Sequence, residues 1–222
     1  MKNLIKLLAV IVAFTFATET FAQNIGVKAG LNMSNMLYKD DDGTYSDDFK
    51  MLMGFHVGAV AEFPINELLS FEPGLMLSTK GFKISETESF FGQSVEIDGS
   101  MNLYYVDIPL NLRANIDAGG IGVYGLLGPY VGMGLSGKYK YEMSAAGQTE
   151  TEEEDVNFGS GDDDDFKPLD FGLTIGAGVA INALEIGVQY AYGLANISVH
   201  TDGGAYIGNR VISLSVAYKI GK

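Results

Sequence analysis

The segment 169–192, "LDFGLTIGAGVAINALEIGVQYAY", alternates apolar residues with glycine, threonine and polar residues in two successive runs. Only Asn182 and Ala183 separate the two runs. A repeat of two residues is the spacing of side chains along one face of a β-strand. The segment therefore predicts two antiparallel strands joined by a tight turn.

Two shorter sequences inside this segment resemble fragments of nucleotide-binding motifs. They are Asp170-Phe171-Gly172, the metal-binding triplet of protein kinases, and the glycine pair of 176–178. A kinase needs further motifs that this chain lacks, and a dinucleotide-binding loop needs a helix after its glycines. Here an alternating strand follows instead. We interpret the glycines as strand residues that leave room for bulky side chains inside a curved sheet.

The same alternation recurs along the whole chain. It predicts eight strands, at residues 24–34, 54–63, 69–80, 105–116, 121–135, 169–181, 184–192 and 211–220. Tight turns alternate with long polar loops, and the loops lie near 37–51, 81–102, 136–168 and 194–208. This arrangement predicts an all-β fold, an eight-stranded antiparallel up-and-down transmembrane β-barrel. Both termini and the short turns are expected at the periplasmic end, with the long loops outside.

The first 22 residues have the features of a secretory signal peptide. Lys2 and Lys6 precede the apolar run "LLAVIVAFTFA", and Thr20-Phe21-Ala22 supplies small residues before the expected cleavage. We therefore divide the chain into a signal peptide, 1–22, and one barrel domain, 23–222. The chain has no cysteine, which excludes disulfides and an N-terminal lipid anchor. No later run approaches the roughly 18 apolar residues that a membrane-spanning helix needs.

The formal net charge of the chain is −14, which argues against nucleic acid as a partner. Most acidic residues fall in the predicted loops, in runs such as "DDDGTYSDD" at 40–48, "ETEEED" at 150–155 and "GDDDD" at 161–165. We interpret these runs as solvated charge and predict no metal site and no cofactor. Binding of divalent cations, including bridges to lipopolysaccharide phosphates, stays open as an alternative.

A set of polar residues occupies the strand faces opposite the apolar ones. If the apolar faces meet lipid, the polar faces line the lumen, where buried charges must pair. An eight-stranded barrel is just wide enough for side chains to fill it. We therefore predict a plugged, ion-paired interior with no catalytic residues. The candidate lumen residues are Lys28, His56, Glu62, Glu72, Asp107, Arg113, Glu185 and Lys219.

Several longer motifs, in this order, carry a family resemblance. They are "GVKAGLNMS", "FEPGLMLSTKG", "YYVDIPLNLR", "GPYVG", "DFGLTIGAGVAI", "LEIGVQYAYGLANI" and "NRVISLSVAYKI". The chain resembles the small outer-membrane β-barrel family of Gram-negative bacteria described as porin-family or PorT-like. The resemblance covers nearly all of the chain after the signal peptide. It implies a location in the cell outer membrane after export through the periplasm.

The resemblance also implies which partners and which kinds of function to expect. The expected partners are outer-membrane lipid and lipopolysaccharide, the barrel-assembly machinery, and another envelope protein. We expect a structural or interaction role, in envelope integrity, surface contact or docking of a partner, and no enzymatic activity. The alternatives are a narrow porin-like channel, a soluble lipocalin-like barrel with its apolar face around a ligand, and an accessory factor in protein secretion. Alternation alone does not decide which face points inward.

Overall fold

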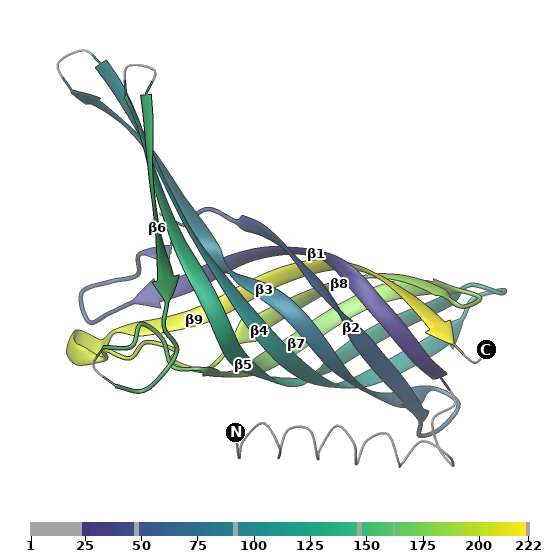
Figure 1. The fold of residues 1–222 in the computed structure, drawn as a ribbon. Coiled ribbons are helices and arrows are strands. Elements are labelled where there is room, and N and C mark those ends of the chain that lie inside the picture. The colour runs from purple at the N-terminus through teal and green to yellow at the C-terminus, as the bar shows by residue number, and fades with distance from the viewer. Residues whose placement is uncertain (1–23, 47–48, 91–92, 146–147, 162, 221–222) are drawn as a thin grey trace.

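The computed structural model describes residues 24–46, 49–90, 93–145, 148–161 and 163–220. The signal peptide predicted for residues 1–22 lies outside the described residues. Within these residues the chain forms nine strands, arranged as an elongated barrel with a projection at one end, and a one-turn 3-10 helix, η2 (Asp202–Gly204), precedes the last strand (Figure 1). The strands are β1 (Asn24–Lys39), β2 (Leu52–Pro64), β3 (Leu69–Phe90), β4 (Gln93–Asp117), β5 (Gly122–Ala145), β6 (Gln148–Val156), β7 (Leu169–Ile181), β8 (Leu184–Gly193) and β9 (Tyr206–Ile220).

Eight of the nine strands close into a ring. The sheet order is β4-β3-β2-β1-β9-β8-β7-β5-β6, and β4 also pairs with β5. Every pairing is antiparallel, and β1 meets β9 with Ala29 opposite Val216, which joins the two ends of the described chain. The eight-stranded antiparallel barrel predicted from the alternation is confirmed. β6 pairs only with β5 and stands outside the ring.

Two of the predicted long loops are wrong, because most of 81–102 and much of 136–168 is strand. β3 and β4 stay paired from Phe90 and Gln93 down to the ring, and β6 pairs with the far half of β5. Carboxylates and serines are poor strand formers, so these segments lack the composition that marks a strand. Cross-strand pairing overrides that preference. We call the resulting four-stranded projection, residues 81–90, 93–102, 137–145 and 148–156, the arm (Figure 1).

The arm leaves the ring at a β-bulge. The pairing of β4 with β5 shifts between Tyr104 and Tyr105, which lie opposite Ser136 and Gly134, so that Leu135 has no direct partner in this pairing. A bulge bends a strand and increases its twist. The bulge lies at the place where β5 stops pairing with β7 and begins to pair with β6, so the bend directs the arm away from the ring.

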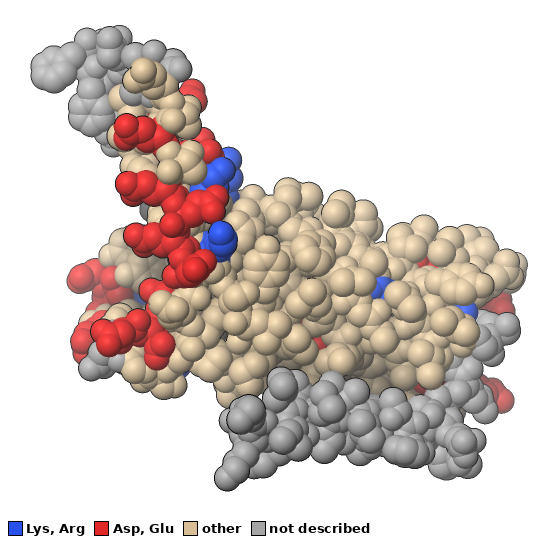
Figure 2. Space-filling model, viewed as in Figure 1, with Lys and Arg blue, Asp and Glu red and all other residues tan. Residues whose placement is uncertain are grey.

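The outer surface of the ring is apolar. Val27, Leu127 and Ile175, from three different strands, are each more than half exposed. In Figure 2 the barrel surface shows almost no charged atoms, while acidic residues cover the arm and one end. An apolar surface this large is rare on a soluble monomer and is the surface that lipid requires. The soluble lipocalin-like alternative, which needs the apolar face inside, is therefore wrong.

No helix within the described residues is long and apolar enough to cross a membrane.

Candidate functional site

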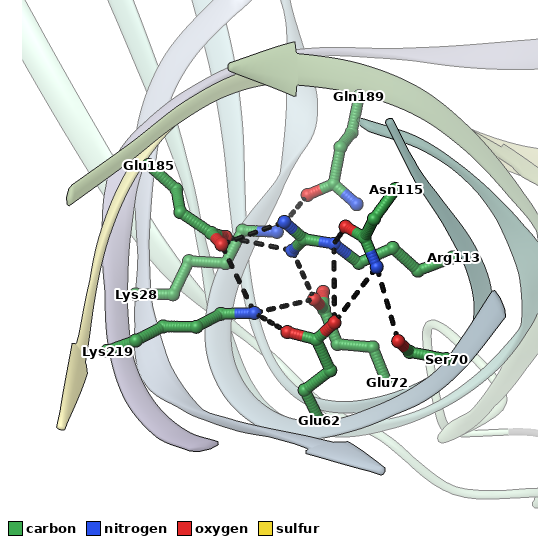
Figure 3. Close-up of polar contacts among 9 residues, drawn as sticks. All are labelled: Lys28, Glu62, Ser70, Glu72, Arg113, Asn115, Glu185, Gln189 and Lys219. Carbon is green, nitrogen blue, oxygen red and sulfur yellow. Dashed lines mark hydrogen bonds and ion pairs between the residues drawn. The ribbon is translucent and has the colours of Figure 1, made fainter. Parts of the chain in front are cut away.

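The interior of the ring near the short turns holds a network of charged side chains centred on Arg113 (Figure 3). Its guanidinium donates from Nη1 to Glu72 Oε2 at 2.7 Å, and it binds Glu185 through two hydrogen bonds of 2.7 and 2.8 Å. The flat guanidinium also lies 3.8 Å from the ring centre of Tyr124. Paired hydrogen bonds of this kind are the strongest that arginine makes with a carboxylate.

A second cation, Lys219 of β9, completes the network. Its Nζ forms an ion pair with Glu62 and lies 3.2 Å from Glu185 Oε1. Asn115 links Arg113 to Glu62, the partner of Lys219, since it accepts a 2.7 Å hydrogen bond from Arg113 Nε and donates to Glu62 at 3.0 Å. All three carboxylates therefore have cationic partners. Charges this deeply buried destabilise a fold unless they are paired in this way.

A layer of uncharged polar side chains lies farther along the lumen. His56 Nδ1 lies 2.8 Å from Asn32 Oδ1, and His56 Nε2 lies 3.0 Å from Ser215 Oγ. Asn32 also donates to Ser78 Oγ at 3.0 Å. Lys28, between this layer and the Arg113 network, donates to Gln189 Oε1 at 2.5 Å. These contacts link β1 to β2, β3 and β8, and β2 to β9, along one arc of the ring.

The serine, histidine and asparagine of this layer have the connectivity of a hydrolytic relay. However, Ser215 is only 2% exposed. The nearby lumen cavity, of about 80 Å³, is lined by Asn32 and His56, and Ser215 is not among its described lining residues. A nucleophile must reach the reacting atom of a substrate within about 3 Å. The geometry is that of a hydrogen-bonded support for the ring.

A third layer, toward the arm, is centred on Lys80. Its Nζ donates to Asp107 Oδ1 at 2.8 Å and to Asp170 Oδ2 at 2.9 Å. The ammonium also lies 4.4 and 4.6 Å from the ring centres of Tyr105 and Tyr130. Cations are attracted to aromatic faces, most strongly where water is excluded. Lys80 is thus held by two carboxylates and two aromatic rings.

An apolar cluster covers this end of the lumen. We call it the cap, and its buried members are Met36, Leu103, Tyr105, Val156, Phe166, Ala195 and Ile197. Phe158 and Phe166, from the segment between β6 and β7, bring aromatic rings over the mouth, and Phe158 packs edge-on against Tyr105 at 5.6 Å. The opposite mouth is a hollow of about 480 Å³ lined by residues that include Glu62, Arg113 and Tyr124.

The structure places all eight candidate lumen residues inside the ring, but not in one site. Five of them, Glu62, Glu72, Arg113, Glu185 and Lys219, form the network of Figure 3. Lys28 is drawn beside that network but has no ion pair in it, and His56 and Asp107 belong to the second and third layers.

Sequence reasoning missed Lys80, Asp170 and the cap. Lys80 shares the even-numbered face of β3 with Glu72, so the alternation could have found it. Asp170 drew attention only as the first residue of the kinase-like triplet, and nothing in that triplet indicates Lys80 as its partner. The cap had no local signal, because Phe158 and Phe166 lie within an acidic segment predicted to be a solvated loop. No group of three or more histidine, cysteine, aspartate or glutamate residues in the described ranges could hold a metal ion.

None of the curated proteins compared with the chain matches it in sequence. Among solved structures, the chain is similar to Ail, the attachment invasion locus protein of Yersinia pestis, solved in complex with the heparin analogue sucrose octasulfate. The identity is 19% and the TM-score 0.39, over 89% of this chain and 99% of that one. The chain is also similar to the outer membrane protein OprG from Pseudomonas aeruginosa, with 11% identity and a TM-score of 0.43 over 91% of this chain and 98% of that one. A third similar structure is the outer membrane protease OmpT from Escherichia coli, with 9% identity and a TM-score of 0.32 over 91% of this chain and 99% of that one. A family model described as "Outer membrane protein beta-barrel domain" matches residues 21–199.

Proposed function

This chain belongs to the outer membrane protein beta-barrel domain family, and from that premise we propose that it is a non-conducting membrane anchor whose arm makes contact with another molecule at the cell surface. Its location is the cell outer membrane. The observation that carries the proposal is the combination of a filled lumen with a folded projection that takes no part in closing the ring.

The filled lumen argues against the narrow channel. A diffusing ion would have to separate Arg113 from Glu72 and Glu185, and then Lys80 from its two carboxylates. Breaking a buried pair costs several kcal/mol because it leaves a charge without a partner. The cap adds an apolar barrier at the arm end. The cavity of about 80 Å³ between these layers has room only for a few water molecules.

The arm supports an interaction role. Nine residues of β6 and the far half of β5 form a sheet that stands beyond the ring (Figure 1). Ordering that sheet costs conformational entropy, on the order of 1–2 kcal/mol for each residue of backbone. Since the ring closes through other pairings, the arm contributes nothing to spanning the membrane. A contact function is the simplest reason for such a segment to be folded.

The remaining assignments are part of the same proposal. Residues 1–22 direct export and are removed, and 23–222 form the barrel domain. The apolar belt contacts outer-membrane lipid and lipopolysaccharide, and the barrel-assembly machinery inserts the chain. We assign no enzymatic role. The support is the inaccessible Ser215 and the absence of a metal-holding group from the described part of the chain.

Planar-bilayer recording of the purified, refolded chain tests the proposal. The expected result is a bilayer that stays at the conductance of protein-free lipid, although the folded chain is present in the membrane. Heat-modifiable migration on a gel verifies folding in the same sample. Discrete, stable conductance steps from the folded chain would overturn the proposal in favour of a narrow channel.

A further inference from the structure

The arm has two chemically different faces. In an antiparallel sheet, residues directly opposite each other point to the same side. One row across the arm is Ile84, Gly99, Tyr141 and Glu152, and the rows two residues away on either side have the same orientation. We call this side the inner face because it continues the lumen side of β3 and β4. Its members are Phe82, Ile84, Glu86, Ile97, Gly99, Met101, Tyr139, Tyr141, Met143, Glu150, Glu152 and Glu154.

The inner face is apolar across three of its four strands except at Glu86 of β3, which is exposed and has no ion pair among the described residues. At its base, Phe82, Met101 and Tyr139 pack against the cap. Farther out, Ile84, Ile97 and Tyr141 are half-buried, and Met143 is 39% exposed.

In the described part of the chain, the segment before β2 touches the base of the arm, where Lys50 pairs with Lys83 at the edge of β3 and Phe49 stacks on Phe82 with ring centres 4.2 Å apart. Beyond that base, no other described strand pairs with the arm. An apolar sheet face that no other described strand covers beyond its base is a typical interaction surface.

The carboxylates differ between the two faces. On the outer face three carboxylates pair with lysines of the arm: Lys138 with Glu153 at 3.3 Å, Lys140 with Glu142 at 3.1 Å, and Lys83 with Asp98 at 3.3 Å. A hydrogen bond from Ser85 and the charge of Lys83 lower the pKa of the Asp98 carboxyl. The outer face is therefore largely neutralised by its own lysines, although Glu96 and Asp155 on the same face have no ion pair among the described residues.

On the inner face the carboxylates have no such partners. Glu150, Glu152 and Glu154 are exposed, and among the described residues no lysine or arginine lies within ion-pair distance of them. Each stands directly across from an apolar residue of β5, in the pairs Met143–Glu150, Tyr141–Glu152 and Tyr139–Glu154. An apolar strip is thus bordered along its length by unneutralised negative charge.

We propose that the inner face of the arm is the docking surface for a partner protein whose contact patch is apolar and bordered by lysine or arginine. This inference rests on the proposed function and specifies the partner's chemistry. The apolar strip excludes water from the contact, and the partner's cations reach Glu150, Glu152 and Glu154. Complementary charge at the rim sets specificity and the rate of association, while the buried apolar centre provides most of the affinity.

Other occupants fit this face less well. A second copy of this chain, with a net charge of −14, would bring acidic surfaces together. Lipopolysaccharide phosphates would meet the same repulsion unless divalent cations intervened, and nucleic acid would meet it as well. A cationic protein surface alone neutralises the glutamates directly.

The test compares charge variants on opposite faces of the arm in the full chain. The inner variant is Glu150→Gln with Glu152→Gln and Glu154→Gln. The matched control is Glu142→Gln with Glu153→Gln and Asp155→Asn, which removes the same charge from the outer face. Both are refolded into phosphatidylcholine nanodiscs, with folding checked by heat-modifiable migration. The probe is a synthetic ten-residue peptide of alternating leucine and lysine, and binding to empty nanodiscs is subtracted.

The wild-type chain should bind this peptide and should not bind the same peptide with glutamate in place of lysine. The inner variant should bind about tenfold more weakly, because three exposed charge pairs are lost together, and the control should bind as the wild type does. Tyr141→Ser with Met143→Ser should also weaken binding. The matched pair Lys140→Ser with Glu142→Ser, on the outer face of the same strand, should not.

Equal loss in the inner variant and the control would overturn this inference, and so would the absence of binding to the wild-type chain. The wild-type chain could instead bind lipopolysaccharide in the presence of Mg²⁺, or form a dimer in detergent. If the inner variant alone lost either property, the proposal of a cationic partner protein would be wrong. These outcomes leave the non-conducting anchor intact. A conducting wild-type chain would overturn the proposed function regardless of what the peptide does.

Discussion

At the scale of single residues, the barrel is specified by charges that find partners across the lumen. Arg113 connects β4 to Glu72 of β3 and to Glu185 of β8, which are 41 and 72 residues away in the chain. A buried ion pair adds little net stability compared with an apolar pair, but a broken one is costly. The network therefore favours one arrangement of the strands over others that would separate its charges.

Replacing Arg113 should be strongly destabilising. Arg113→Leu leaves two carboxylates in the lumen with reduced charge compensation, and we expect a loss of about 3–5 kcal/mol in the free energy of unfolding. Urea unfolding in lipid vesicles, followed by tyrosine fluorescence, measures it. Lys83→Leu on the exposed arm, which breaks one surface pair, is the control, and its effect should be about 1 kcal/mol or less. Equal effects would contradict the role of the network.

Gly178 in the opening segment is needed because Tyr124 occupies the adjacent space. A Cβ at Gly178 would lie 2.5 Å from Tyr124 Cζ and would also crowd the backbone of β8 at Ile186. We expect Gly178→Val to lower the free energy of unfolding by about 1–3 kcal/mol. Ala177→Val, on the lipid side of the same strand, should have almost no effect. Tyr124→Ala should partly rescue the Gly178 variant in the same urea assay, and failure of any rescue would contradict the explanation.

At the scale of secondary-structure elements, the long strands serve two purposes. The parts of β3, β4 and β5 below the bulge close the ring, while their outer parts pair only within the arm. Apolar and polar residues alternate in both parts, but the polar side faces the lumen in the ring and water in the arm. The two parts should therefore be separable.

Shortening the arm should leave the barrel folded. Replacing residues 86–97 and 141–152 each by Asn-Gly, the preferred two-residue hairpin turn, keeps every pairing of the ring. The shortened chain should refold in lipid, retain heat-modifiable migration, and show no binding of the leucine–lysine peptide. Aggregation during refolding, with no heat-modifiable band, would show that the arm is needed to form the barrel.

At the scale of the whole molecule, charge is divided between a buried network in the lumen and a solvated projection. Screening by salt acts on exposed charges and much less on buried ones, with a Debye length of about 10 Å at 0.1 M and about 3 Å at 1 M. The lumen network and the arm should therefore respond differently to ionic strength.

Raising the NaCl concentration separates these two responses. Between about 0.1 and 1 M salt, the urea midpoint of the barrel should move little, while peptide binding to the arm should weaken severalfold. The two measurements use the same nanodisc or vesicle preparations. Binding that does not depend on salt would show that the carboxylates of the inner face play no part in it.

The sequence by itself determined the strands of the ring and the side of each strand on which a residue lies. The two-residue repeat of side chains along a strand placed Glu72 and Arg113 on the polar face and Val27 and Ile175 on the apolar face. It could do so because alternation is a local property of an extended backbone. The tight turn at Asn182 was equally local, and that residue has the positive φ of 53° that such turns favour.

Only the tertiary structure decided which residues meet. The stagger between strands is set by closure of the ring, so no local pattern pairs Arg113 with Glu185 or Lys80 with Asp170. The same holds for β6, whose carboxylates are poor strand formers and which exists as a strand because β5 offers it an edge. Alternation assigns a residue to a face, whereas contact across a barrel depends on closure by residues far away in the chain.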